Sequence, residues 1–566
     1  MTPEEKAGLM FQHIAMPGAD GELVDDPAQT RWLPLVRDMI DKQAINHLNL
    51  VGSALPAQIA AWHNTVQEIA VSTRLGIPMT LSSDPRHHFT DNPATSAIAL
   101  GFTQFPETTG LAAIRDEELV REFADLVRRE YLAVGIRVAL HPQIDLATEP
   151  RWSRINGTFG ENAELTGRMA AAYIRGLQGD RIGPNSVAAM TKHFPGGGAQ
   201  KDGEDPHFPH GREQVYPGGR FDYHLAPFLK ALEAGTSQIM PYYGMPVGTE
   251  MEPVGFGFNR GVITGLLREK LGFDGIVCTD WGLITDAPIY AARAWGVEHL
   301  SESERVLKVI EAGCDQIGGE ACPELLVDLI RAGRISSERI DASVRRLLRE
   351  KFVLGLFDNP FVDVDAAAAL VGAPAALEAG LLAQSRSVTV LKNPAAREAA
   401  GDPSALLPLA PGTRLYVEGV DPQVAAAYGT VVASPEEADV AILRLKTPYE
   451  ERSGWIEQSF HSGSLAFADE EITRIQRVCA AVPTVVDIYL DRPAVFPEIA
   501  EAAAAVVANY GAADAPLLDV LFGHRRPEGK LPFQLPRSMA DVERQRSDVP
   551  SDGSEAVYQF GHGLAY

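Results

Sequence analysis

The sequence predicts a (β/α)8-type TIM-like barrel followed by a smaller three-layer α/β sandwich. From about residue 35 to 350, short apolar runs alternate with longer amphipathic stretches, the pattern of parallel α/β domains. This stretch is long enough for a (β/α)8 barrel, which typically needs roughly 250 residues. A second α/β alternation follows, and a chain of 566 residues is too long for one ordinary domain.

The expected barrel strands are the apolar runs at 47–52, 77–82, 136–141, 187–194, 238–243, 276–280 and 315–318. Helical patterns lie between them, at 117–134, 165–178 and 302–312. The chain itself begins with a helix start, because acidic residues follow Pro3. We therefore expect a barrel over residues 1–357.

A linker is expected at residues 358–380, with an alanine-rich connecting helix at 366–377. The sandwich then covers residues 381–566, with strands at 387–391, 414–418, 440–445, 484–490 and 504–509 and a helix at 469–481. No glycine-rich phosphate loop follows its first strand, which disfavours a nucleotide-dependent function.

Composition excludes several classes of function. The formal net charge is −25, which argues against nucleic acid or anionic membranes as partners. The four cysteines lack the spacing of a metal site. No secretory signal is recognisable, and no apolar run approaches the ~20 residues of a membrane span, so the sequence predicts a cytoplasmic protein.

Polar side chains follow several of the predicted strands. Asp84, Lys192, His193, Tyr243 and Asp280 all come at or just after a strand's end. The carboxyl ends of barrel strands are where ligands bind. An Asp after a strand can also merely cap the next helix, but the repetition over successive strands favours a site.

Asp280 and Trp281 suit sugar chemistry. A carboxylate can attack or stabilise an oxocarbenium-like centre, and an indole can stack on the apolar face of a pyranose. Asp84 could accept hydrogen bonds from vicinal hydroxyls, while Arg154, Lys192 and His193 donate to others.

The chain resembles glycoside hydrolase family 3, the family of β-glucosidases and exo-β-glucanases. The matching segments are Arg151-Trp152-Ser153-Arg154, Thr158-Phe159-Gly160-Glu161, Lys192-His193-Phe194-Pro195-Gly196-Gly197-Gly198, Thr279-Asp280-Trp281, Gly529-Lys530-Leu531-Pro532-Phe533 and Phe560-Gly561-His562-Gly563-Leu564-Ala565-Tyr566. The similarity extends from the first helix to the last residue.

The resemblance implies an active site between barrel and sandwich and a retaining double displacement, without cofactor or metal. It makes Asp280 the nucleophile. It implies that the −1 sugar is held by five polar residues, namely Asp84, Arg154, Lys192, His193 and Tyr243. It also implies that Trp281 borders the +1 site.

The general acid/base is expected on a sandwich loop. Relatives carry a Gly-Glu-x-Pro-Tyr-Ala-Glu pattern there, and the corresponding residues 445–451 keep Pro-Tyr and the final Glu, so Glu451 is the candidate. Glu450 is one residue away. Family members that act on N-acetylglucosaminides instead use an Asp-Ser-His dyad on a barrel loop, which leaves His207, in Asp205-Pro206-His207, as a further candidate.

The resulting prediction is an exo-acting retaining β-glycosidase, with a β-glucosidase as the leading expectation. Its expected substrates are β-linked oligosaccharides or aryl and alkyl β-glycosides. A β-xylosidase, a β-N-acetylglucosaminidase and a non-catalytic sugar-binding relative remain alternatives. A homodimer is a further expectation, since relatives often carry a fibronectin-like domain that this sequence lacks. The sequence fixes neither the −1 sugar nor the preferred linkage.

Overall fold

Eight parallel strands make up the first domain of the computed structural model, which describes all residues except 27, 29, 31, 32, 91, 97–99, 395–404 and 554. The strands are β1 (Phe11–Ala15), β2 (His47–Leu50), β3 (Thr80–Ser83), β4 (Ile136–Ala139), β5 (Ala188–Phe194), β7 (Gln238–Pro241), β9 (Ile276–Val277) and β10 (Ile317–Gly318). They follow the order β10-β1-β2-β3-β4-β5-β7-β9. A parallel bridge between Cys278 and Gln316 joins the two ends of this row, so the sheet curls into a barrel.

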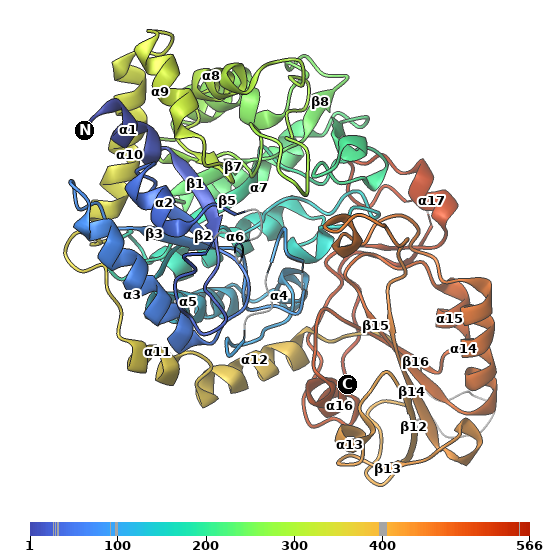
Figure 1. Cartoon of the computed structure of the whole chain (residues 1–566). Coiled ribbons are helices and arrows are strands. Elements are labelled where there is room, and N and C mark those ends of the chain that lie inside the picture. The colour runs from blue at the N-terminus through green and yellow to red at the C-terminus, as the bar shows by residue number, and fades with distance from the viewer. Residues whose placement is uncertain are drawn as a thin grey trace.

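Helices surround the barrel, as Figure 1 shows. They are α1 (Pro3–Leu9), α2 (Val36–Asp41), α3 (Pro56–Ser72), α4 (Thr108–Ile114), α5 (Glu117–Ala133), α6 (Ala163–Gln178), α7 (Phe221–Glu233), the π-helical segment η5 (Gly261–Lys270), α8 (Glu302–Ala312), α9 (Pro323–Arg331) and α10 (Ser337–Val353). The predicted barrel is confirmed. The prediction missed its first strand, β1, because this run is short and follows the opening helix directly.

The second domain is a six-stranded sheet with helices against it, and it lies beside the barrel (Figure 1). Its strands are β11 (Thr389–Lys392), β12 (Arg414–Glu418), β13 (Thr430–Val431), β14 (Val440–Lys446), β15 (Thr484–Tyr489) and β16 (Ala505–Asn509). Its helices are α13 (Pro422–Ala425), α14 (Asp469–Ala481), α15 (Pro497–Ala502), α16 (Asp514–Leu521) and α17 (Met539–Arg544). Only the edge strand β11 pairs antiparallel within this sheet. Two short pairs complete the described strands, β6 (Glu213–Val215) with β8 (Met245–Val247) and β17 (Leu535–Pro536) with β18 (Ala556–Tyr558).

The connection between the domains contains two helices where the sequence predicts one. They are α11 (Val364–Leu370) and α12 (Pro374–Ser387), and Pro374 begins the second. By length and composition, Val364–Ser387 is apolar enough for a membrane span, contrary to the expectation that no run approaches this. A single such stretch is weak evidence of a span. Here α11 packs on α3 and α5, and α12 packs on α4 and α16.

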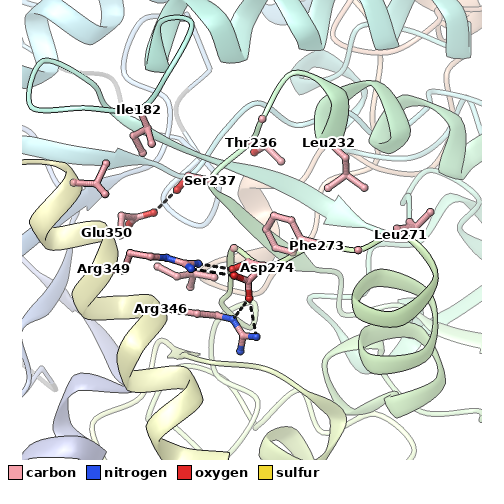
Figure 2. Close-up of a pocket in the computed structure, with 15 residues that line it drawn as sticks. Ile182, Leu232, Thr236, Ser237, Leu271, Phe273, Asp274, Arg346, Arg349 and Glu350 are labelled. Carbon is pink, nitrogen blue, oxygen red and sulfur yellow. Dashed lines mark hydrogen bonds and ion pairs between the residues drawn. The ribbon is translucent and has the colours of Figure 1, made fainter.

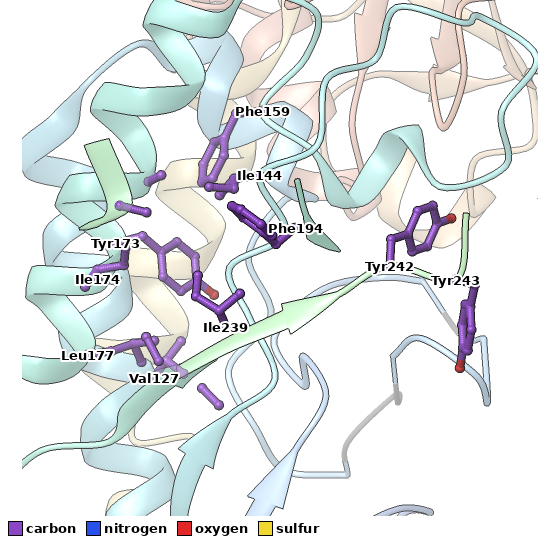
Figure 3. Packing of buried hydrophobic residues seen from close by; sticks show 14 of the residues in the cluster. Val127, Ile144, Phe159, Tyr173, Ile174, Leu177, Phe194, Ile239, Tyr242 and Tyr243 are labelled. Carbon is purple, nitrogen blue, oxygen red and sulfur yellow. The ribbon is translucent and has the colours of Figure 1, made fainter. Parts of the chain in front are cut away.

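Packing between the barrel strands and the surrounding helix α6 positions the end of β7, which two of the site residues follow. Figure 3 shows Ile239 on β7 near Phe194 and Tyr173, with Tyr242 and Tyr243 at the strand's carboxyl end and their rings pointing to different sides. All five side chains are buried. Packing therefore fixes the end of β7 where the site lies.

A cavity of about 380 Å³ lies at the opposite, amino end of β7 and β9. Figure 2 shows Arg346 and Arg349 of α10 converging on Asp274 there. Arg346 Nε donates to Asp274 Oδ1 at 3.1 Å and Arg349 Nη1 donates to Oδ2 at 3.0 Å. Because Asp274 already engages both guanidinium groups, we assign this end of the barrel to stability.

The C-terminal segment returns to the barrel and ties the two domains together. Asp548 accepts hydrogen bonds from the backbone N–H groups of Gly218 and Arg220, both at 2.7 Å. Ser551 donates to the buried carboxyl of Glu161, from its hydroxyl at 2.5 Å and from its backbone N–H at 3.2 Å. Burial raises the pKa of Glu161 to about 7, against an ordinary 4.5.

This raised pKa predicts a pH dependence of stability. Between about pH 4.5 and pH 7 the unfolded chain loses the Glu161 proton while the folded chain keeps it, so the free energy of unfolding falls as pH rises. In Glu161→Gln the amide oxygen can accept from the Ser551 N–H and the amide NH2 can donate to the Ser551 hydroxyl oxygen, and the titration is removed. We expect the variant to match wild type near pH 4.5 and to exceed its free energy of unfolding at pH 8 by up to about 3 kcal/mol.

Urea unfolding at several pH values measures the difference, with the exposed Glu164→Gln as the control. Equal pH slopes for wild type and Glu161→Gln would contradict the assignment.

Candidate functional site

A cavity of about 580 Å³ opens at the carboxyl ends of the barrel strands. It is lined by all six predicted sugar-binding residues and by the predicted nucleophile, together with His207: Asp84, Arg154, Lys192, His193, His207, Tyr243, Asp280 and Trp281. Lys192 and His193 lie near the end of β5 itself, and the other residues come from the loops after β3, β4, β5, β7 and β9. The fold thus brings together side chains that are up to 197 positions apart in the sequence, from Asp84 to Trp281.

Asp280 follows β9 and presents one free carboxylate oxygen. Its Oδ1 accepts from the Trp281 backbone N–H at 2.9 Å. Its buried Oδ2 has no hydrogen-bond partner among the described residues and lies 3.8 Å from His193 Nε2. A fixed carboxylate with an unengaged oxygen is suited to nucleophilic attack.

Asp84 and Lys192 form an ion pair on the cavity wall. Lys192 Nζ lies 2.9 Å from Asp84 Oδ1, and Asn49 Nδ2 donates to Asp84 Oδ2 at 3.3 Å. Asp84 remains partly exposed to the cavity, so its oxygens can accept further hydrogen bonds from a ligand's hydroxyl groups.

His193 is held in one orientation by Asp145 and Arg154. Its Nδ1 lies 2.7 Å from Asp145 Oδ2, and Arg154 Nη1 donates to its Nε2 at 3.1 Å. Burial, followed by the charge of Arg154, lowers the pKa of His193 well below its usual range. His193 is therefore neutral, with its proton on Nδ1 toward Asp145.

The glycines after His193 allow close backbone contacts. A Cβ on Gly198 would lie 1.8 Å from the carbonyl oxygen of Leu146, and Gly198 has φ +94°. A Cβ on Gly197 would lie 2.9 Å from Tyr242 Cε1 and 3.0 Å from Asp145 Oδ1. In this chain the ring of Tyr242 therefore occupies the space beside position 197.

Gly197→Ala tests this packing. The added methyl group must displace Tyr242 or Asp145, so we expect a loss of about 1–3 kcal/mol in unfolding free energy. We also expect a fall of roughly tenfold or more in kcat/KM, because both neighbours orient site residues. Gly183→Ala is the matched control, since no atom lies within 4 Å of its added Cβ. Equal behaviour of the two variants in thermal melts and assays would refute the packing argument.

Asp205 and His207 form a buried pair on the loop after β5. His207 Nδ1 lies 2.6 Å from Asp205 Oδ1, and Trp152 Nε1 and Tyr242 OH donate to Asp205 Oδ2 at 2.9 Å and 3.2 Å. Burial opposes ionisation of Asp205, but His207 and Arg154 hold its pKa well below its usual range. The carboxylate is therefore ionised beside the imidazole.

His207 lines the cavity, and its Nδ1 is the ring nitrogen held by Asp205. Burial lowers the pKa of His207, and Asp205 opposes that shift. The ring lies among Tyr243, Phe208 and Phe460, with Tyr243 at 4.7 Å and Phe460 at 4.9 Å between ring centroids. No hydrogen bond to Nε2 is present within the described ranges, so this atom can exchange a proton with a ligand.

The two candidate sandwich glutamates lie outside the cavity walls. Glu451 is exposed and has no ion pair or hydrogen bond within the part of the chain that the structure describes. Glu450 Oε1 accepts from the Ser464 backbone N–H at 3.1 Å. The same loop instead contributes Trp455 and Ile456 to the cavity. The role of Glu451 stays a prediction.

Four residues at the site were missing from the predicted set. Asn49 and Asp145 hold Asp84 and His193, and Tyr242 holds Asp205. Arg293 donates to the carbonyl oxygens of Trp281 at 2.9 Å and His207 at 3.2 Å. The position of Asp145 near a strand end was a usable signal for it. The contact of Arg293 depends on a loop path that the sequence pattern does not specify.

No cluster of three or more His, Cys, Asp or Glu side chains suited to a metal ion occurs among the described residues. The polar groups of the cavity are paired carboxylates, imidazoles and cations. This donor set suits hydroxyl-rich ligands, and its residue types match acid/base and nucleophilic chemistry.

Comparisons with known proteins agree with this arrangement. Residues 34–350 match the model of the glycosyl hydrolase family 3 N-terminal domain, and residues 333–566 match that of the family 3 C-terminal domain. The chain is 52% identical over 572 residues to the probable beta-glucosidase C of Aspergillus oryzae, covering 100% of this chain and 88% of the relative. It is 40% identical over 593 residues to the periplasmic beta-glucosidase/beta-xylosidase of Dickeya chrysanthemi, with 100% and 88% coverage.

Solved structures share the fold. A mutant of the exo-1,3/1,4-beta-glucanase from a Pseudoalteromonas species superposes with a TM-score of 0.79 at 22% identity, covering 100% of this chain and 93% of the other. A mutant beta-glucosidase from Listeria innocua, in complex with laminaribiose, gives a TM-score of 0.79 at 21% identity, with 100% and 82% coverage.

Proposed function

Because the chain belongs to glycoside hydrolase family 3, we propose that it is an exo-acting retaining β-glucosidase in which Asp280 is the nucleophile and His207 the general acid/base. The single observation that carries the proposal is the shared cavity. It holds the free Oδ2 of Asp280, the sugar-binding set and the outer face of His207 together. The names of the relatives support glucose as the −1 sugar.

In the first step, Asp280 Oδ2 attacks the anomeric carbon and the bond from that carbon to the leaving oxygen breaks. His207 Nε2 supplies the proton that the leaving oxygen takes up, and Asp205 stabilises the charged imidazolium while it exists. A covalent glycosyl-enzyme results.

In the second step, His207 accepts a proton from water as that water attacks the anomeric carbon. The bond to Asp280 breaks, so the sugar leaves with its original β configuration. Both ring nitrogens of His193 are already engaged by Asp145 and Arg154, which leaves the transferred proton to His207.

Glu451 remains the alternative acid/base. It matches the family pattern at the final Glu of residues 445–451, and it would have to reach the leaving oxygen from outside the cavity walls. The relative from Dickeya chrysanthemi also keeps xylose open as a −1 sugar. The cytoplasmic location and the homodimer stay predictions.

A panel of aryl β-glycosides tests the proposed function. We expect the highest kcat/KM on the β-D-glucoside, a lower value on the β-D-xyloside, and the lowest on the β-N-acetylglucosaminide. Proton NMR of the first-formed sugar should show the β anomer. Highest activity on the N-acetylglucosaminide, or an α first product, would overturn the proposal.

A further inference from the structure

Besides the polar sugar-binding set, the cavity is lined by apolar side chains. They come from loops after β1, β2, β9 and the sandwich strand β14, and from residue 33: Met16, Leu33, Val51, Ile289, Trp455 and Ile456. Trp455 is 55% exposed and Met16 is 41% exposed, although both side chains are apolar. Exposed apolar side chains gathered at the mouth of a cavity indicate a surface that a ligand covers.

Trp281 supplies a rigid wall of this cavity. Its ring lies directly on the backbone of Gly318 and Gly319, where an added Cβ would come within 2.8 Å of ring atoms. Its backbone carbonyl is held by Tyr243 OH at 2.8 Å and by Arg293 Nη1 at 2.9 Å. One face of the indole is therefore fixed by packing, and the cavity contact of the side chain is preorganised.

Several further polar side chains that line the cavity already have partners in the protein, whereas the buried Trp281 Nε1 has none among the described residues. Arg293 donates to the carbonyl oxygens of Trp281 and His207. Ser96 Oγ donates to the Thr90 carbonyl at 3.0 Å. Thr30, Ser53 and Tyr290 are not free either.

A second sugar at this position would lose water from its hydroxyl groups without gaining an equal number of new hydrogen bonds. Such unpaired polar groups cost binding free energy, whereas aliphatic and aromatic walls favour apolar groups. From this contrast we infer that the leaving-group region takes an apolar aglycone, alkyl or aryl, in preference to a second sugar. The inference rests on the proposed function, because it concerns the group that departs from the same anomeric carbon.

Alkyl glucosides give the sharpest test, since their leaving alcohols change little in basicity along a series. We expect kcat/KM to rise from methyl through butyl to hexyl β-D-glucopyranoside, by about two- to fourfold per methylene while the alkyl chain contacts the walls. The hexyl glucoside should exceed cellobiose and laminaribiose by about tenfold or more.

Trp455→Ala and Ile456→Ser should each flatten the series, which lowers the ratio of hexyl to methyl kcat/KM by about threefold or more. Phe361→Ala is the matched control, because Phe361 is also an exposed aromatic residue but does not line the cavity. It should leave the ratio unchanged.

The outcomes separate the two proposals. Hydrolysis of methyl β-glucoside with a flat series, or a preference for cellobiose or laminaribiose, overturns the apolar aglycone and leaves the proposed function standing. The apolar aglycone is also overturned if the ratio of hexyl to methyl kcat/KM is the same in Trp455→Ala, Ile456→Ser and wild type. Failure to hydrolyse any β-glucoside in the panel overturns the proposed function, and this inference with it.

Discussion

Asp280→Asn is expected to lower kcat on 4-nitrophenyl β-D-glucopyranoside by at least about 10³-fold. The amide keeps the size of the side chain, and its oxygen can still accept from the Trp281 backbone N–H. It removes the negative charge and the nucleophilic oxygen that must form the covalent intermediate. Steady-state kinetics, with circular dichroism to show that the variant is folded, measure the effect.

The exposed Asp222→Asn, on the outer helix α7, is the matched control for removing one carboxylate. It should retain wild-type kinetics. A folded Asp280→Asn enzyme with more than about a tenth of wild-type kcat would rule out Asp280 as the nucleophile.

His207→Ala is expected to lower kcat/KM on substrates with poor leaving groups by about 10²–10⁴-fold. The loss should be much smaller on 2,4-dinitrophenyl β-glucoside, whose leaving group needs no proton. Glu451→Gln should stay within about twofold of wild type on both, because an exposed surface side chain away from the cavity contributes little. The dependence of log(kcat/KM) on leaving-group pKa in each variant measures the difference.

The Asp205→Asn variant separates an acid/base role for His207 from a purely structural one. Asp205 raises the pKa of His207, so loss of its charge should lower the pKa. Because the general acid must be protonated, the alkaline limb of the kcat/KM profile should move to lower pH. Two results together would transfer the acid/base role to Glu451. The alkaline limb of the Asp205→Asn profile would stay at the wild-type pH, and log(kcat/KM) of Glu451→Gln would depend steeply on leaving-group pKa.

Much of the architecture was predictable because burial imposes regular patterns on the sequence. Parallel strands buried on both faces appear as continuous apolar runs, such as residues 187–194. The carboxyl ends of such strands meet at one end of the barrel, so Asp84, Lys192 and Asp280 could be placed together from the sequence. The missed strand β1 and the split of the connecting helix at Pro374 reflect local boundaries that periodicity resolves poorly.

The acid/base candidate was harder to predict because it depends on loop paths. Glu451 matches a linear pattern, yet its loop turns Trp455 and Ile456 toward the cavity. The pairing of His207 with Asp205 depends on Trp152 and Tyr242, which are 90 positions apart in the sequence. The space that a residue larger than Gly197 would need is occupied by Tyr242, and this contact also could not be read from the sequence.

The central claim is that Asp280 is the nucleophile and His207 the general acid/base. Identifying the product formed in the presence of azide tests it most directly. Small anions need no general base to attack the glycosyl-enzyme, so the His207→Ala variant with 2,4-dinitrophenyl β-glucoside and azide should release β-glucosyl azide. In this step the bond from the anomeric carbon to Asp280 breaks as the carbon–nitrogen bond forms. Under the same conditions the Glu451→Gln variant should give glucose alone. β-Glucosyl azide from Glu451→Gln but not from His207→Ala would contradict the assignment of His207, and an α-glucosyl azide would contradict the double displacement on Asp280.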